Sequence, residues 1–113
     1  MNLLQIKNGN ILTSYGLIEG GSILISDEKI VAIAKGDISV QADKVIDASS
    51  KLILPGAIDV HPHIDDPSFF EGREDFETGT RSAIVGGVTS MVEMPTWNPV
   101  LEKTVIENKI NRG

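Results

Sequence analysis

Residues 55–63 read Pro-Gly-Ala-Ile-Asp-Val-His-Pro-His, and this stretch decides what fold the chain can form. It ends an apolar run, residues 52–60, which predicts a strand covered on both faces, as in a parallel sheet. His61 and His63 lie two positions apart, so their side chains project to one face if the strand continues through them. Two neutral imidazoles on one face are half of a transition-metal site. The alternative is a polar turn that holds two histidines by chance.

A helix is predicted downstream of the histidines. Apolar and small residues recur at helical spacing over residues 73–85. Glu74, Asp75 and Glu77 suit the positive end of that helix, and Gly86-Gly87 predicts its end. Gly79, Gly86 and Gly87 are interpreted as positions of close packing or as residues that end the helix.

Residues 88–94 predict a second buried strand, and residues 101–110 predict another amphipathic helix. Strand, helix, strand and helix in this order are two β/α units, with a loop after the carboxyl end of each strand. Enzymes built on a (β/α)8 barrel place their chemistry there. Such a barrel needs eight strands and typically about 250 residues. We therefore expect the chain to be the front part of something larger.

The first 51 residues predict short strands separated by turns. Residues 3–6 and 11–12 flank Asn8-Gly9, which is the strongest short signal for a hairpin. Their spacing favours an antiparallel meander or a small sandwich. The expected fold is α/β with additional β structure: residues 1–51 form part of a small β-sandwich, and residues 52–113 form the first two units of a truncated barrel. Further strands are expected at residues 22–25, 30–34 and 44–47.

Composition excludes several classes of function. The 113 residues carry a net charge of −6, are 41% hydrophobic and 23% charged, and include no cysteine. Scattered basic residues argue against a nucleic-acid partner, and no thiolate site can form. No apolar run approaches the roughly 20 residues that span a bilayer, and the start lacks a signal-peptide pattern. We expect a cytoplasmic protein with no membrane partner.

Four blocks of the sequence, in this order and spacing, resemble the amidohydrolase superfamily. The nearest branch is that of the cyclic amidohydrolases, which comprises dihydroorotases, allantoinases and hydantoinases, and the dihydroorotase pattern is closest. The resemblance covers nearly the whole chain and implies the N-terminal portion of a metal-dependent hydrolase that opens a cyclic amide ring. The blocks are residues 55–63, 74–81, 86–89 and 93–95.

The resemblance also implies a metal site. His61 and His63 match the His-x-His pair that binds one of two metals, usually zinc, at the end of the first barrel strand. In the family a later lysine, two further histidines and a catalytic aspartate complete the site. We expect these residues beyond Gly113, and we expect no catalytic residue in this chain. A hydroxide that bridges the two metals attacks the amide carbonyl in such enzymes.

The resemblance is weaker at positions that select the substrate. Dihydroorotases usually carry arginine where this chain has Asp65, and asparagine where it has Thr96. An acidic side chain would repel the carboxylate of dihydroorotate. Hydantoinases often have aspartate at that position, whereas Glu93-Met94-Pro95 follows the allantoinase and dihydroorotase pattern. Asp65 and Asn98 are the predicted substrate-binding residues, and the alternative for each is an ordinary loop or turn residue.

Three further alternatives stay open. Asp59 either orients a metal ligand or caps the backbone at a strand end. The whole protein is either an enzyme or a dihydroorotase-like scaffold without catalysis. The third alternative is that the chain acts alone as a small β-rich binding module; the isolated chain is expected to be catalytically inactive. Its expected partners are a small cyclic amide and either the remainder of the barrel or another copy of the chain, in a homo-oligomer.

Overall fold

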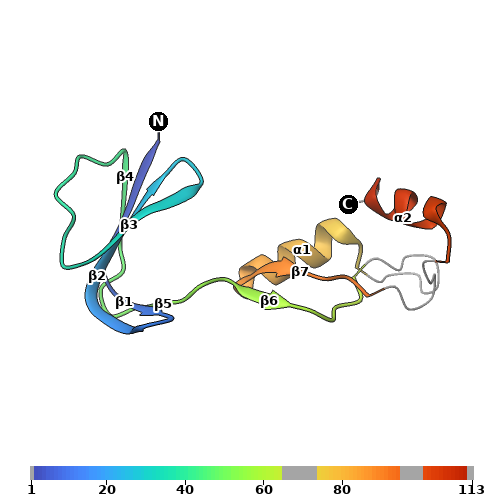
Figure 1. The fold of residues 1–113 in the computed structure, drawn as a ribbon, viewed down its shortest axis with the longest axis horizontal. Coiled ribbons are helices and arrows are strands. Elements are labelled where there is room, and N and C mark those ends of the chain that lie inside the picture. The colour runs from blue at the N-terminus through green and yellow to red at the C-terminus, as the bar shows by residue number, and fades with distance from the viewer. Residues whose placement is uncertain (1, 65–73, 95–100, 112–113) are drawn as a thin grey trace. The chain divides into compact units, whose positions relative to one another are not determined.

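The computed structural model describes residues 2–64, 74–94 and 101–111. The chain divides into two compact units, Met1–Pro55 and Gly56–Gly113 (Figure 1). The first unit contains β1 (Leu3–Thr13), β2 (Gly16–Ser26), β3 (Lys29–Lys35), β4 (Lys44–Asp47) and β5 (Leu52–Ile53), and the second contains β6 (Ala57–Asp59), α1 (Phe76–Val85), β7 (Val88–Met91) and α2 (Lys103–Ile110).

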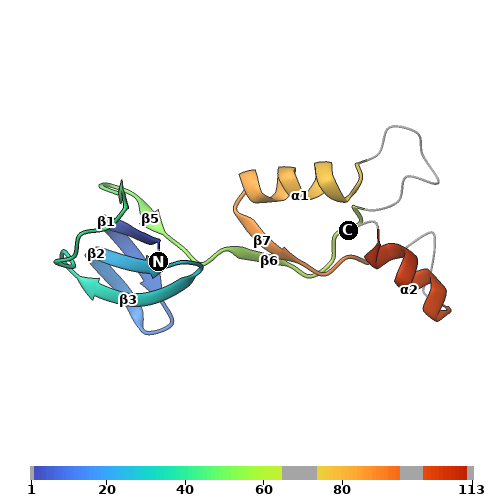
Figure 2. The same cartoon turned by 90° about the horizontal axis from the view of Figure 1, so that it is seen from above.

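The first unit is one sheet in the order β3-β2-β1-β4, with β5 also paired to β1. β1, β2 and β3 are antiparallel neighbours and lie side by side in Figure 2. The predicted antiparallel meander is therefore confirmed for these three strands. β4 and β5 instead run parallel to β1, so the expectation of purely antiparallel pairing is wrong.

The predicted hairpin at Asn8-Gly9 is wrong, because β1 continues through both residues. Pairing with β2 shifts register on either side of Gly9, as at a β-bulge. Asn8 adopts a left-handed φ of 64°, and its side-chain amide donates to Asp47 Oδ1 at 3.0 Å. A Cβ on Gly9 would collide with the side chain of Ile53, which would have to move to make room for any larger residue. Asn8 and Gly9, which are residues typical of a turn, thus form a bulge within a continuous strand.

The apolar run at residues 52–60 is not the single strand that we predicted. Leu52 and Ile53 form β5 and pair with β1, whereas Ala57–Asp59 form β6 and pair with β7. Pro55 between them has no N–H to donate to a ladder, so a strand cannot continue unbroken through it. The predicted barrel segment, residues 52–113, thus includes two residues whose strand partners lie in the first unit.

In the second unit, β6 and β7 are parallel neighbours, with Ala57 opposite Val88 and Asp59 opposite Met91. α1 connects them, as the predicted β/α order requires. The helix predicted over residues 73–85 is confirmed, although it begins at Phe76 with Asp75 as its N-cap. Parallel strands joined by a helix bring their carboxyl ends to the same edge.

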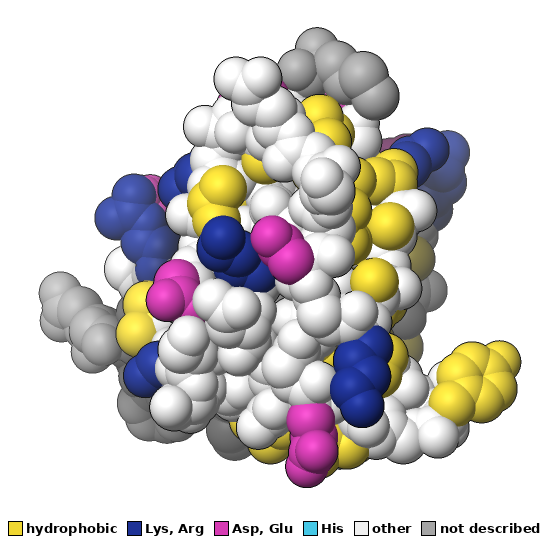
Figure 3. Space-filling model, turned by 90° about the vertical axis from the view of Figure 1, so that its left-hand side faces the viewer, with side chains coloured by type: hydrophobic (Ala, Val, Ile, Leu, Met, Phe, Trp, Pro, Cys, Tyr) yellow, Lys and Arg dark blue, Asp and Glu magenta, His cyan; other side chains and the backbone are white. Residues whose placement is uncertain are grey.

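Little apolar surface is buried within the described residues. Ile11, Ile23, Ala48 and Ile64 are the buried apolar residues there. Apolar side chains reach the surface among charged ones in the space-filling view (Figure 3). Both faces of β6 were expected to be covered, but Ile58 in this chain is 65% exposed. No helix in the described ranges is long and apolar enough to cross a bilayer.

Candidate metal centre

His61 and His63 follow the carboxyl end of β6. His61 lies in a bend and His63 in a segment without regular structure, so neither is in the strand itself. The expectation that the strand continues through them is therefore wrong. The segment nevertheless stays beside the segment that follows β7. Val92 N donates to Asp59 O at 2.8 Å, and Met94 N donates to Pro62 O at 2.9 Å. Backbone hydrogen bonds thus hold the histidines near the edge where the two strands end.

The two imidazole rings contact each other edge to face. Their centroids are 5.2 Å apart with an interplanar angle of 73°, and both side chains are exposed. Zn–N bonds of about 2.0–2.1 Å at a tetrahedral angle place two imidazole centroids about 5 Å apart. The ring centroids are therefore about as far apart as those of two imidazoles that share one metal ion.

The backbone sets which nitrogen of His63 carries a proton. His63 Nδ1 lies 2.6 Å from Met94 O. A carbonyl oxygen can only accept a hydrogen bond, so Nδ1 donates, and a neutral His63 ring has its lone pair on Nε2. A metal-binding histidine commonly donates its other ring nitrogen to a carbonyl in this way.

Asp59 holds the turn that leads to the histidines. Its Oδ1 accepts a hydrogen bond from His61 N at 3.0 Å. This contact is the backbone-capping role that the sequence allowed for Asp59. The carboxylate therefore acts on the path of the chain at His61.

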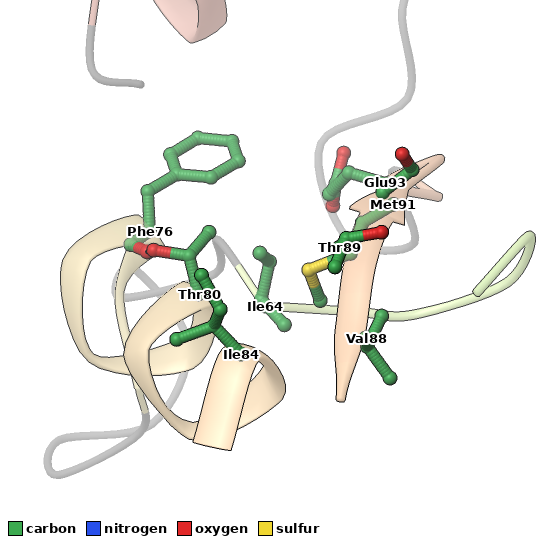
Figure 4. Close-up of a pocket in the computed structure, with 9 residues that line it drawn as sticks. Ile64, Phe76, Thr80, Ile84, Val88, Thr89, Met91 and Glu93 are labelled. Atoms are coloured by element: carbon green, nitrogen blue, oxygen red, sulfur yellow. The ribbon is translucent and has the colours of Figure 1, made fainter. Parts of the chain in front are cut away.

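Close packing against α1 also holds the segment that contains the two histidines. Ile64, directly after His63, is 6% exposed and faces Gly79 of α1. A Cβ added to Gly79 would lie 2.9 Å from Ile64 Cβ, which confirms Gly79 as a position of close packing. Figure 4 shows Ile64 between the side chains of α1 and those of β7. They line a cavity of about 300 Å³ formed by Ile64, Phe76, Thr80, Ile84, Val88, Thr89, Ser90, Met91 and Glu93.

The described residues supply two neighbouring imidazoles and no cluster of three or more His, Cys, Asp or Glu side chains that could hold a metal. A stable zinc site has four ligands, so this pair is an incomplete donor set. The predicted substrate-binding residues Asp65 and Asn98 lie outside the described residues. Sequence reasoning missed the carbonyl of Met94, because a backbone acceptor leaves no signature in the residue types.

Sequence comparison relates the chain to named enzymes. It is 45% identical over 100 residues to a dihydroorotase of Bacillus cytotoxicus, covering 88% of this chain and 23% of that protein. It is 41% identical to a dihydroorotase of Acetivibrio thermocellus, covering 97% of this chain and 26% of that protein. The chain thus spans about a quarter of the length of these curated relatives. No family model matches it.

Structure comparison gives the same class. The L-hydantoinase (dihydropyrimidinase) of Arthrobacter aurescens matches with a TM-score of 0.81 at 35% identity, over 99% of this chain and 25% of that one. A dihydropyrimidinase of Brevibacillus agri matches with a TM-score of 0.79 at 34% identity, over 98% of this chain and 24% of that one. The sequence relatives are thus named dihydroorotases, and these two solved relatives are named hydantoinase or dihydropyrimidinase. The chain belongs to the cyclic amidohydrolase branch of the amidohydrolase superfamily and corresponds to an N-terminal portion of its members.

Proposed function

We propose that this chain is the N-terminal part of a metal-dependent hydrolase that opens a cyclic amide ring. The observation that carries the proposal is the contact between the His61 and His63 rings, at the edge where parallel strands β6 and β7 end. In this proposal β6 and β7 are the first two strands of a (β/α)8 barrel, and the first unit is part of a β-sandwich. The parallel pairing through α1 supports the barrel, since that fold keeps its chemistry at the carboxyl ends of strands.

The two histidines act as ligands in this proposal. Bound zinc, or another divalent metal, would supply a hydroxide between two ions and polarise the amide carbonyl near neutral pH. His61 and His63 hold one ion and do not act as acid or base, because a coordinated nitrogen has no lone pair for a proton. Met94 O keeps the proton of His63 on Nδ1. Asp59 fixes the backbone of His61 through its hydrogen bond to that N–H.

The substrate is proposed to be a small cyclic amide. Dihydroorotate is the first candidate, because the curated relatives are named dihydroorotases. Hydantoin, a dihydropyrimidine and allantoin are the others, and the solved relatives are named hydantoinase or dihydropyrimidinase. Asp65 and Asn98 are proposed to contact the substrate. Asp65 disfavours a substrate carboxylate at its position, which makes a neutral ring the main competitor of dihydroorotate.

The test uses the full-length gene product, stripped of metal and reloaded with zinc. Dihydroorotate, hydantoin, dihydrouracil and allantoin are each assayed for ring opening. We expect turnover of at least one, and a loss of at least about a thousandfold in kcat/KM for His61→Ala and for His63→Ala, since removal of a ligand disables the metal. Lys103→Met, on the exposed side of α2, is the matched control and retains activity. No turnover of any of the four with metal bound would refute the proposal.

A non-catalytic scaffold is the second candidate. It is favoured by Asp65 and Thr96, which stand where dihydroorotases usually carry arginine and asparagine. Metal analysis of the full-length protein separates the two. About two equivalents of metal per subunit support the enzyme, whereas none supports the scaffold.

A further inference from the structure

Glu93 and Lys109 form an ion pair that differs from the neighbouring ones. Lys109 Nζ lies 3.5 Å from Glu93 Oε2, and the side chains are only 12% and 16% exposed. Two other ion pairs, Glu77–Arg81 and Lys103–Glu107, join residues four apart on one helix, and their side chains are 52–87% exposed. The attraction within a mostly buried pair is screened less by solvent and salt than the attraction within an exposed pair.

The position of the pair connects α2 to the end of β7. Lys109 lies in the last turn of α2, and Glu93 lies two residues beyond β7. The attraction therefore acts between two elements that are separated along the chain. Glu93 also lines the cavity between α1 and β7, where Figure 4 shows it above Met91.

Glu93 directly precedes the residue that orients His63. Met94 donates its N–H to Pro62 O at 2.9 Å and accepts from His63 Nδ1 through its carbonyl oxygen. The planar peptide that joins the two residues carries Met94 N, so a shift of the backbone at Glu93 moves the hydrogen bond to Pro62 O directly. Met94 O lies on the far side of the same residue and is displaced with its Cα. Glu93 is therefore the direct chain neighbour of the residue whose carbonyl oxygen accepts from His63 Nδ1.

We propose that Glu93 and Lys109 act together as positioning residues for the His63 imidazole. The ion pair anchors the chain at Glu93 to α2, which keeps Met94 O in line with His63 Nδ1 and leaves the lone pair on Nε2. This inference rests on the proposed role of His61 and His63 as metal ligands. As a consequence, the charges of Glu93 and Lys109 influence the affinity for metal, although neither side chain contacts the metal or the substrate.

The test measures two properties of Glu93→Gln, Lys109→Met and the double variant in the full-length gene product. The first is the affinity for zinc, by competition with a chelator. The second is the tautomer of His63 in metal-free protein, by ¹⁵N NMR with histidine labelling and assignment from His63→Gln. We expect each single variant to lose about tenfold in zinc affinity, as for other groups that orient a ligand. We also expect a mixture of tautomers at His63, and a double variant no worse than the poorer single one.

Matched variants separate positioning from general effects of charge. Lys103→Met and Glu107→Gln break the exposed pair on the same helix, and we expect their zinc affinity within about twofold of the parent. Lys109→Arg keeps the positive charge, and we expect it to have the zinc affinity and the His63 tautomer of the parent. Unaltered tautomer and affinity in both single variants overturn the inference, as does a double variant that loses the product of the two single effects. A parent protein that binds no zinc overturns the proposed function instead, and the tautomer still tests the positioning of His63.

Discussion

The carbonyl oxygen of Met94 selects the nitrogen of His63 that is able to bind a metal. At 2.6 Å it accepts from Nδ1, and the ring then has the tautomer of a ligand that coordinates through Nε2. Asp59 and Gly79 act on the same segment by different means. Asp59 accepts from His61 N, and Gly79 allows α1 to approach Ile64. Single residues therefore orient the histidines through the backbone and through packing.

The size of Gly79 is testable. Alanine is the better helix former by about 1 kcal/mol, which would stabilise the exposed part of a helix. At this position the added Cβ meets Ile64 Cβ at 2.9 Å, closer than real contacts allow. We expect Gly79→Ala to lower the free energy of unfolding by about 1–3 kcal/mol, as overpacking does, and to weaken metal binding.

Denaturant unfolding of the full-length protein measures that change. Gly86→Ala is the control, because Gly86 has a right-handed φ of −80° and an added Cβ would lie 3.4 Å from its nearest neighbour, the carbonyl oxygen of Ala83. If Gly79→Ala were as stable as the parent, the close contact between residue 79 and Ile64 would not affect stability, and the prediction would be wrong.

The sequence predicts a helix or strand correctly where residues within that element are sufficient to form it. α1 begins at Phe76 because Asp75 and Thr78 cap it reciprocally: Thr78 N donates to Asp75 Oδ1 at 2.9 Å, and Asp75 N donates to Thr78 Oγ1 at 3.0 Å. β4 spans Lys44–Asp47, as predicted. Asn8-Gly9 misled because a turn and a bulge require the same left-handed backbone, and only the pairing with β2 distinguishes them.

The start of α1 carries a dependence on pH. The N–H of Thr78 and its hydroxyl hold the pKa of Asp75 below its ordinary value. A carboxyl group with a lowered pKa in the folded state stabilises the fold fully above its unfolded pKa of about 4, and this contribution is lost as pH falls through the folded pKa. We expect Asp75→Ala to melt a few degrees below the parent at pH 7, and the difference to shrink in acid below about pH 4.

Thermal unfolding followed by circular dichroism at several pH values checks this expectation. Glu102→Ala is the control, because Glu102 is the N-cap of α2 but its side chain makes no capping hydrogen bond. A melting difference for Asp75→Ala that stays the same at pH 7 and in acid would show that the ionised carboxylate does not stabilise the helix.

At the scale of the whole molecule, each unit presents apolar side chains that its own residues leave uncovered. In the second unit, Val85 is 89% exposed, Leu101 is 83% exposed and Ile110 is 70% exposed. Large exposed apolar areas associate with other protein surface. The relatives are about four times as long as this chain, and their additional length offers one source of cover.

We expect the 113-residue chain alone to have no cyclic amidase activity, because its two imidazoles are an incomplete set of metal ligands. We also expect it to self-associate, because its apolar surfaces are exposed. Size-exclusion chromatography with light scattering, together with the assay of the four cyclic amides, checks both points. The full-length gene product is the control. A stable, monodisperse and uncomplexed monomer would contradict the expectation of self-association.

The sequence by itself determined the helix at residues 73–85, the strand at residues 44–47 and the pair of histidines, because helical and strand periodicity and the spacing of His61 and His63 depend on residues close together in the chain. It also determined the family, through the order of its blocks. Only the tertiary structure decided that β5 joins β1, that Met94 O orients His63, and that Glu93 meets Lys109. Those contacts join residues from separate parts of the chain, and the energy that selects them exists only once the strands and helices are packed.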